Sequence, residues 1–82
     1  MIRERLVRRY TDPRGRTWDV VIGRESFGAL YALFVPAAET RAETRQALLH
    51  ADSQTAARQE LEAMSDDEMT ELFERSEPKR LQ

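Results

Sequence analysis

The chain has 82 residues, a net charge of −2, one histidine and no cysteine. This length allows one domain and leaves little apolar surface for a deep pocket. The composition excludes disulfides, thiolate metal sites, Cys-His catalysis and multi-histidine metal centres. No apolar run is long enough to cross a bilayer and the N-terminus lacks a signal-peptide pattern, so we expect a cytoplasmic protein with no membrane partner.

Charge is distributed unequally along the sequence. Residues 1–28 contain seven basic and four acidic side chains, a balance of +3, whereas the remainder contains six basic and eleven acidic side chains, a balance of −5. The amino-terminal part is therefore basic and the carboxyl-terminal part acidic, which favours electrostatic association with a partner or between copies.

The first predicted element is a hairpin centred on Asp12-Pro13-Arg14-Gly15, which has the residue preferences of a type I turn followed by a glycine bulge. Counting outward from this turn places Tyr10 opposite Trp18 and Arg9 opposite Asp19. The same register puts Thr11 opposite Thr17, Arg8 opposite Val20 and Leu6 opposite Ile22. The core face then carries Leu6, Tyr10, Trp18, Val20 and Ile22, with Arg8 at its margin.

A turn over residues 23–28, bounded by two glycines, connects the hairpin to the next strand. Residues 29–35 are apolar on both faces, as expected of a central strand that helices cover on one side, and Pro36 ends it.

Residues 37–51 are ambiguous between two structures. A loop through Glu43 and a strand over Thr44–Ala51 is the preferred interpretation, because the residues before Gln46 place almost nothing apolar on a helical stripe. The alternative is a long helix running to Met64, since the segment is rich in helix formers.

Two helices are predicted at the C-terminal end. Asp52-Ser53 begins the first, which reaches about Met64 and buries Ala57, Leu61 and Met64. Ser65 and Glu68 form a capping box that begins the second. Its buried stripe is Met69, Leu72 and Phe73, and Glu77-Pro78 ends it.

These elements predict an α+β fold, in which a three- to four-stranded antiparallel β-meander is followed by two short C-terminal helices packed on one face. We expect residues 1–78 to form the single domain and residues 79–82 to form a frayed tail.

No catalytic constellation is evident. Ser26 lacks the first glycine of a hydrolase elbow, and Gly23 with Gly28 lacks the Lys-Ser/Thr of a phosphate loop. The acidic side chains in the first turn of the second helix interact favourably with the helix dipole. The acidic cluster could also bind a divalent cation or a basic partner. We therefore predict no enzymatic activity, no cofactor, no metal and no small-molecule substrate.

The candidate partner-binding residues are arginines of the hairpin. Arg3, Arg5 and Arg9 are expected to share the outer face with Val7, and Arg14 and Arg16 lie at the turn. Together they would form a basic ridge that matches phosphates or carboxylates. Charged side chains on an edge strand also prevent aggregation, which needs no partner.

The leading functional hypothesis is a small non-enzymatic interaction module, acting as an adaptor, regulator or accessory subunit. It would bind another protein, or itself as a homodimer, through a sheet edge or the helix pair. The alternative is a nucleic-acid-associated protein that uses the arginine ridge. A third hypothesis is that the acidic helices imitate nucleic acid and inhibit a nucleic-acid-binding protein.

Overall fold

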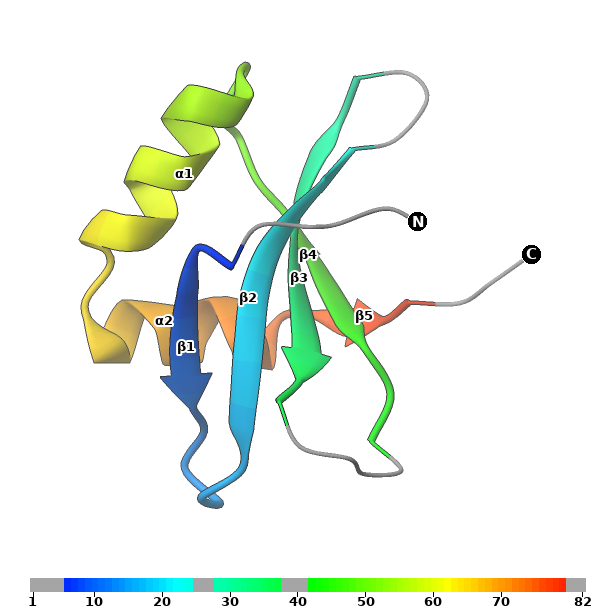
Figure 1. The fold of residues 1–82 in the computed structure, drawn as a ribbon, viewed down its shortest axis with the longest axis vertical. Coiled ribbons are helices and arrows are strands. Elements are labelled where there is room, and N and C mark those ends of the chain that lie inside the picture. The colour runs from blue at the N-terminus through cyan, green and yellow to red at the C-terminus, as the bar shows by residue number, and fades with distance from the viewer. Residues whose placement is uncertain (1–5, 25–27, 38–41, 80–82) are drawn as a thin grey trace.

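The computed structural model describes residues 6–24, 28–37 and 42–79. Five strands form one antiparallel sheet in the order β1-β2-β3-β4-β5, and two helices lie between β4 and β5 in the sequence (Figure 1). The bounds are β1 Arg8–Thr11, β2 Thr17–Arg24, β3 Leu30–Pro36, β4 Arg45–Leu48, α1 Gln54–Ala63, α2 Asp66–Glu74 and β5 Glu77–Pro78. The predicted α+β meander with two C-terminal helices is confirmed. The short fifth strand is an addition to it.

The hairpin between β1 and β2 has the predicted register. Tyr10 lies opposite Trp18 and Arg9 opposite Asp19. The backbone N–H of Gly15 donates to the carbonyl of Asp12 at 2.9 Å, and Gly15 has a φ of 86°. A positive φ is inexpensive only for a residue without a Cβ, which explains the glycine at this corner.

The predicted alternation fails at the start of β1. Leu6 was expected in the core but is 44% exposed. Val7 was expected on the outer face but packs against the core cluster. The Val7 amide donates to the carbonyl of Val20, the residue already paired with Arg8, so two successive residues face one partner and the alternation breaks there.

The ambiguous segment contains strand β4 rather than a long helix. β4 is shorter than the predicted Thr44–Ala51 strand and pairs with β3 from Arg45 opposite Phe34 to Leu48 opposite Tyr31. Helix α1 begins after Ser53, whose side chain accepts from the amide of Ala56. The helix therefore begins at the predicted position, and the alternative of one long helix through residues 37–64 is wrong.

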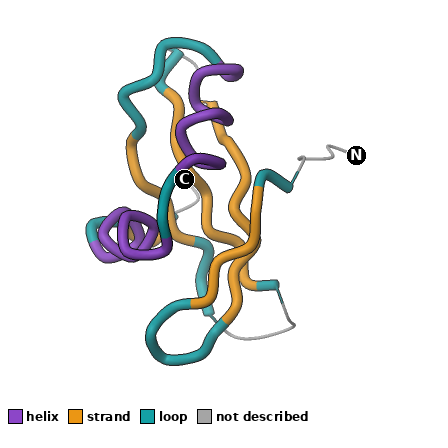
Figure 2. The backbone as a smooth tube through the Cα atoms, turned by 90° about the vertical axis from the view of Figure 1, so that its left-hand side faces the viewer, coloured by secondary structure: helices purple, strands orange, loops and turns teal. Residues whose placement is uncertain are grey.

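Both helices pack against one face of the sheet (Figure 2). The predicted capping box of α2 is present, with Ser65 accepting from the Glu68 amide and Glu68 accepting from the Ser65 amide. The core between the layers contains apolar side chains from every longer strand and both helices: Tyr10, Trp18, Val20, Leu30, Ala32, Phe34, Ala47, Leu49, Ala57, Leu61, Met69 and Leu72. No helix in the described ranges is long and apolar enough to span a membrane.

Arg8 connects the hairpin to both helices. Its Nη1 donates to the carbonyls of Leu61 at 3.1 Å and Met64 at 2.7 Å, which close the C-terminal end of α1. Its Nη2 lies 3.4 Å from Oδ1 of Asp66 in the first turn of α2. The arginine thus adds a donor to the Leu61 carbonyl, which also accepts from the Met64 amide, and supplies one to the Met64 carbonyl.

Strand β5 was not predicted, because Glu77-Pro78 was interpreted only as a helix stop. These residues do follow the end of α2, but they also pair with Gln46 and Arg45 of β4. Lys79, predicted to begin the tail, donates its backbone N–H to the carbonyl of Thr44 at 2.8 Å. Proline is acceptable here because β5 is an edge strand.

Candidate functional site

The hairpin turn is organised by one buried carboxylate. Oδ1 of Asp12 accepts from the backbone N–H groups of Arg14 and Arg16, each at 2.9 Å, and Oδ2 accepts from Nε1 of Trp18 at 3.1 Å. Burial by itself raises the pKa of Asp12, but hydrogen bonds from Trp18, Arg16 and Arg14 hold that pKa below its ordinary value. Asp12 is therefore an anion that fixes the turn, and its oxygens are occupied within the protein.

Four aromatic side chains cluster beside this turn, and two of them, Trp18 and Phe73, form the base of the cleft described below. The ring of Phe73 lies at the centre of the group, with its centroid 5.1 Å from that of Trp18, 5.1 Å from that of Phe34 and 5.4 Å from that of Tyr10. The Tyr10 hydroxyl donates to Oγ1 of Thr70 at 2.9 Å, which attaches β1 to α2. Tilted and edge-to-face contacts of this kind give the base a fixed shape.

Arg45 approaches the same region from β4. Its Nε donates to Oγ of Ser76 at 2.8 Å and its Nη2 to the Ser76 carbonyl at 2.6 Å. Its guanidinium carbon lies 5.6 Å from the centroid of the Phe73 ring, within the range of a cation-π contact. These contacts hold the guanidinium in one place, and none of them comes from a carboxylate of the described residues.

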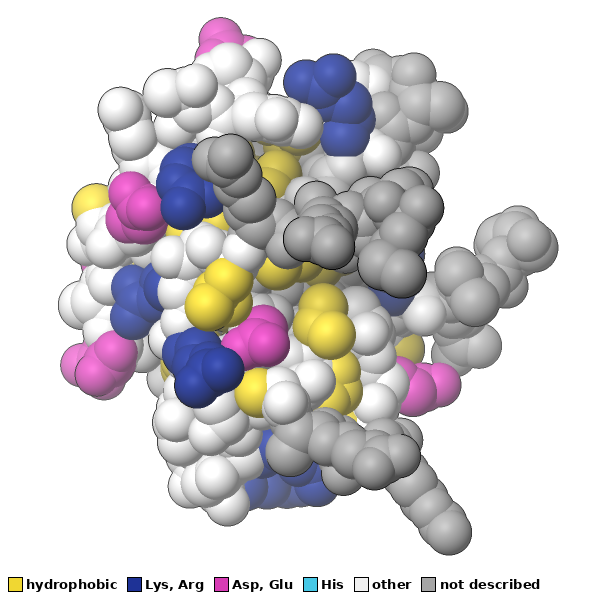
Figure 3. Space-filling view, in the orientation of Figure 1, with side chains coloured by type: hydrophobic (Ala, Val, Ile, Leu, Met, Phe, Trp, Pro, Cys, Tyr) yellow, Lys and Arg dark blue, Asp and Glu magenta, His cyan; other side chains and the backbone are white. Residues whose placement is uncertain are grey.

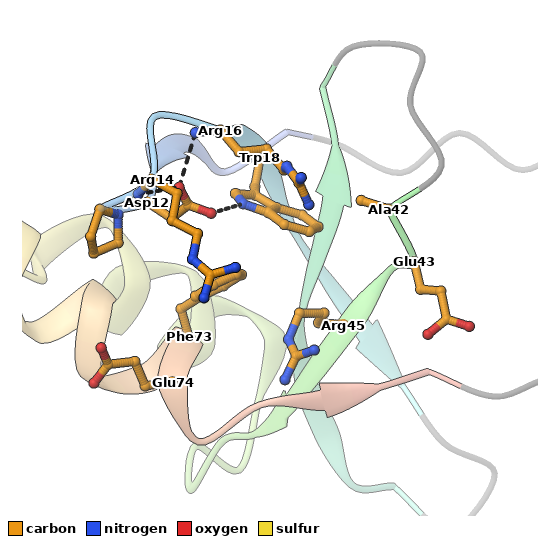
Figure 4. A pocket seen from close by; sticks show the side chains of 10 residues that line it. Asp12, Arg14, Arg16, Trp18, Ala42, Glu43, Arg45, Phe73 and Glu74 are labelled. Atoms are coloured by element: carbon orange, nitrogen blue, oxygen red, sulfur yellow. Dashed lines mark hydrogen bonds between the residues drawn. The ribbon is translucent and has the colours of Figure 1, made fainter.

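The three arginines Arg14, Arg16 and Arg45 border a cleft of about 410 Å³. Trp18 and Phe73 form its base, and Figure 4 shows Arg14 extending toward the Phe73 ring, Arg16 beside Trp18, and Arg45 on the β4 side of the cleft. We call this feature the arginine cleft. It combines cationic donors with an apolar base, which suits an anionic group attached to an apolar one.

No carboxylate of residues 6–24, 28–37 or 42–79 forms an ion pair with these three arginines. Glu43 and Glu74 also line the cleft, but Figure 4 shows their carboxylates directed away from its centre. Arg14 and Arg16 are exposed, so their guanidinium groups are accessible to a ligand. The cleft therefore presents three guanidinium groups without a carboxylate at ion-pair distance among the described residues, and Arg16 interacts electrostatically with the Asp12 carboxylate.

The predicted arginine ridge is only partly assembled. Arg14 and Arg16 lie together at the cleft, whereas Arg9 lies away from it and pairs through Nε with Oδ1 of Asp19 at 3.1 Å. Arg3 and Arg5 lie outside the described residues. On the face that Figure 3 shows, the basic groups are separated from one another by acidic, apolar and neutral surface.

Sequence reasoning missed Arg45, Phe73 and Glu74 as members of one site. Arg45 begins the strand whose existence was ambiguous, and Phe73 was assigned only to the core. In the structure Arg45 lies opposite Phe34, a core residue of β3. Without the helix packing, nothing in the sequence brings Arg45 to the hairpin turn.

The described lining of the cleft contains few titratable groups. Its only described titratable groups besides the arginines are Asp12, which is fully hydrogen-bonded, and the outward-directed Glu43 and Glu74. Within the described ranges, no three histidine, aspartate or glutamate side chains are placed to hold a metal ion. In the acidic group of α2, Asp66 pairs with Arg8 and Glu68 caps the helix.

The chain was compared with protein-family models, with curated proteins and with solved structures, and none of the three comparisons gave a match.

Proposed function

We propose that this protein is a small non-enzymatic interaction module that binds an acidic segment of another protein in the arginine cleft. The observation that carries the proposal is that Arg14, Arg16 and Arg45 line one cleft with an aromatic base, and none of them forms an ion pair with a described carboxylate. A guanidinium forms two parallel hydrogen bonds to a carboxylate, so an aspartate or glutamate side chain fits between these groups.

The rigid turn supports this function. Because the backbone N–H groups of Arg14 and Arg16 are both bonded to Asp12, the backbone beneath the two arginines is already ordered before a ligand arrives. Only side-chain freedom is lost on binding, which reduces the entropic cost. Arg45 is further restrained by Ser76 and needs little additional ordering.

A nucleic acid is the alternative partner, and two observations make it less favoured. Trp18 is 2% exposed, so its ring face is not open to a stacking base. Arg9 is paired with Asp19 and lies outside the cleft, so the described arginines form no continuous row of cations to follow a phosphate backbone.

The test compares two anionic probes, fluorescein-labelled hexaglutamate and a fluorescein-labelled oligothymidylate, by fluorescence anisotropy. We expect hexaglutamate to bind and the R14E/R16E variant to bind it about tenfold or more weakly, because two favourable charges become unfavourable. R9E is the matched control, since Arg9 is an exposed arginine of the same hairpin that lies outside the cleft.

Three outcomes would contradict the proposal. If R9E weakened hexaglutamate binding as much as R14E/R16E, net charge rather than the cleft would be responsible. Preferential binding of oligothymidylate would support the nucleic-acid alternative. Absence of binding to either probe at low salt would remove the cleft as an anion site. Affinity purification of the tagged protein from its own cells, with nuclease treatment and with R14E/R16E as a parallel bait, then identifies the native partner.

A further inference from the structure

Part of the edge of strand β4 has no neighbouring strand among the described residues. Strand β5 pairs only with Arg45 and Gln46, although β4 continues to Leu48 (Figure 1). The Thr44 carbonyl accepts from Lys79 on the β5 side, and the Leu49 amide donates to Leu30 on the β3 side. Backbone groups of an antiparallel strand alternate between its two neighbours, so the N–H and C=O of Leu48 face the edge that β5 leaves open.

A hollow of about 320 Å³ lies at this position. It is lined by Tyr31, Gln46, Ala47 and Leu48 of the sheet and by Arg75 and Glu77. Leu48 is 44% exposed and is one of two large apolar side chains exposed among the described residues. Arg75 forms no ion pair within the described part of the chain. The hollow thus offers an unpaired strand edge, an apolar contact and a positive charge together.

The path of the chain restricts what can bind there. Ser76 leaves the edge because its amide donates to the carbonyl of Phe73 and its own oxygens accept from Arg45. Glu77 already occupies the place beside Gln46. An added strand that runs in the direction of β5 must therefore end or turn away beside Leu48, and its C-terminal end is the one that reaches Arg75.

We propose that the edge at Leu48 binds the C-terminal segment of another protein as an added β-strand, with the terminal carboxylate beside Arg75. Backbone hydrogen bonds to Leu48 supply affinity, an apolar side chain of the partner covers Leu48 and Tyr31, and Arg75 selects the free carboxylate. The short strand β5 shows that this edge accepts an antiparallel neighbour. This site is separate from the arginine cleft and does not depend on it.

The experiment uses two pools of random hexapeptides that differ only in having a free or an amidated C-terminus. Each pool is passed over the immobilised full-length protein, and the retained peptides are quantified by mass spectrometry. We expect the free-acid pool to be retained about tenfold more strongly, because amidation removes the charge-assisted contact with Arg75.

Three variants and one control, R58Q, locate the site. L48P removes the N–H that faces the open edge without removing a β3 hydrogen bond, and it should abolish retention. R75Q should lower retention of the free-acid pool to that of the amidated pool, whereas R58Q, which removes a charge from α1, should leave it unchanged. E77Q should strengthen retention of the free acids, because it removes a carboxylate from the rim of the hollow.

Circular dichroism establishes that each variant is folded. If L48P does not fold, N-methylation of alternate amides in a retained peptide tests the backbone contacts without altering the protein. Equal retention of the two pools, unchanged retention by R75Q, or failure of the wild-type protein to retain the free-acid pool would each overturn the proposal. Full binding of the N-methylated peptides would overturn it as well.

Discussion

Replacing Asp12 by asparagine tests the arrangement on which both the hairpin and the arginine cleft depend. The substitution keeps the shape of the side chain and one acceptor oxygen, which can still serve the two backbone amides that now bond to Oδ1. The new amide nitrogen then faces Nε1 of Trp18, where two donors meet and neither has an acceptor. Rotating the amide by half a turn satisfies Trp18 but opposes the two backbone amides instead.

The loss of stability in D12N can be estimated from the hydrogen-bond donor that loses its acceptor. Trp18 is 2% exposed, so its indole N–H has no access to bulk water. A buried donor without a partner costs about 1–3 kcal/mol, and loss of charge assistance on the other two bonds adds about 1 kcal/mol. We expect D12N to lower the free energy of unfolding by about 2–4 kcal/mol, a large fraction of what a domain of this size has.

A double-mutant cycle separates the two contributions. In the W18F background the indole donor is absent, so D12N should cost only about 1 kcal/mol, which leaves a coupling of about 1–3 kcal/mol. Urea unfolding of the four proteins, followed by far-ultraviolet circular dichroism, measures it without relying on tryptophan fluorescence. Equal cost of D12N in both backgrounds would refute the reasoning, as would a cost in the wild-type background below about 0.5 kcal/mol.

Other stability predictions follow from individual contacts. R8M should lower the free energy of unfolding by about 2 kcal/mol, because the Met64 and Leu61 carbonyls each lose a hydrogen bond from the guanidinium, and urea unfolding measures the change. S65A should cost about 1 kcal/mol by breaking the capping box with Glu68, again measured in urea, and S65D should restore most of it. Since the folded-state pKa of Asp12 is lowered, its stabilising effect is complete above the ordinary value of about 3.9 and is lost as pH falls through the folded value. Thermal unfolding between neutral and acidic pH should therefore show a steeper loss of stability below pH about 4 for wild type than for D12N.

The hairpin was predictable because its information is local. Asp12, Pro13 and Gly15 each favour one position of the turn, and the register of the two strands follows by counting. The structure reproduces four predicted pairs from Arg8 with Val20 to Thr11 with Thr17. The counting fails at Val7 and Leu6, where a break in the alternation has no sequence signal of its own.

The helices were predictable for the same reason, since Ser53 and Ser65 are local start signals. Strand β5 was not, because a two-residue strand containing a proline has almost no intrinsic preference for a sheet. Its pairing with Arg45 depends on where the end of α2 is placed by the core, and on the hydrogen bonds between Arg45 and Ser76. These are contacts between distant segments, which local preference does not encode.

The arginine cleft also combines residues that local sequence signals identify with residues that only long-range contacts bring there. The sequence identified Arg14 and Arg16, which lie on the turn, but joined them to Arg9, which the pleat directs elsewhere and which pairs with Asp19. Arg45 joins the cleft through the meander, which brings the beginning of β4 to the end of the sheet where the turn lies. The structure thus places Arg14 and Arg16 with side chains from two other segments, β4 and α2, rather than with Arg9.

Asp12 supports both the stability of the hairpin and the shape of the arginine cleft, so variants at Asp12 cannot separate folding from binding. A variant at Asp12 disturbs the turn, the buried indole and the cleft at once, so loss of binding by D12N alone would not show which of them mattered. Arg14 and Arg16 instead contribute their backbones to the fold and their exposed side chains to the cleft. Substitutions there should alter binding while leaving the free energy of unfolding within about 0.5 kcal/mol of wild type. Unfolding of R14E/R16E in urea is the check, since a large loss of stability would mean that these side chains serve the fold rather than a ligand.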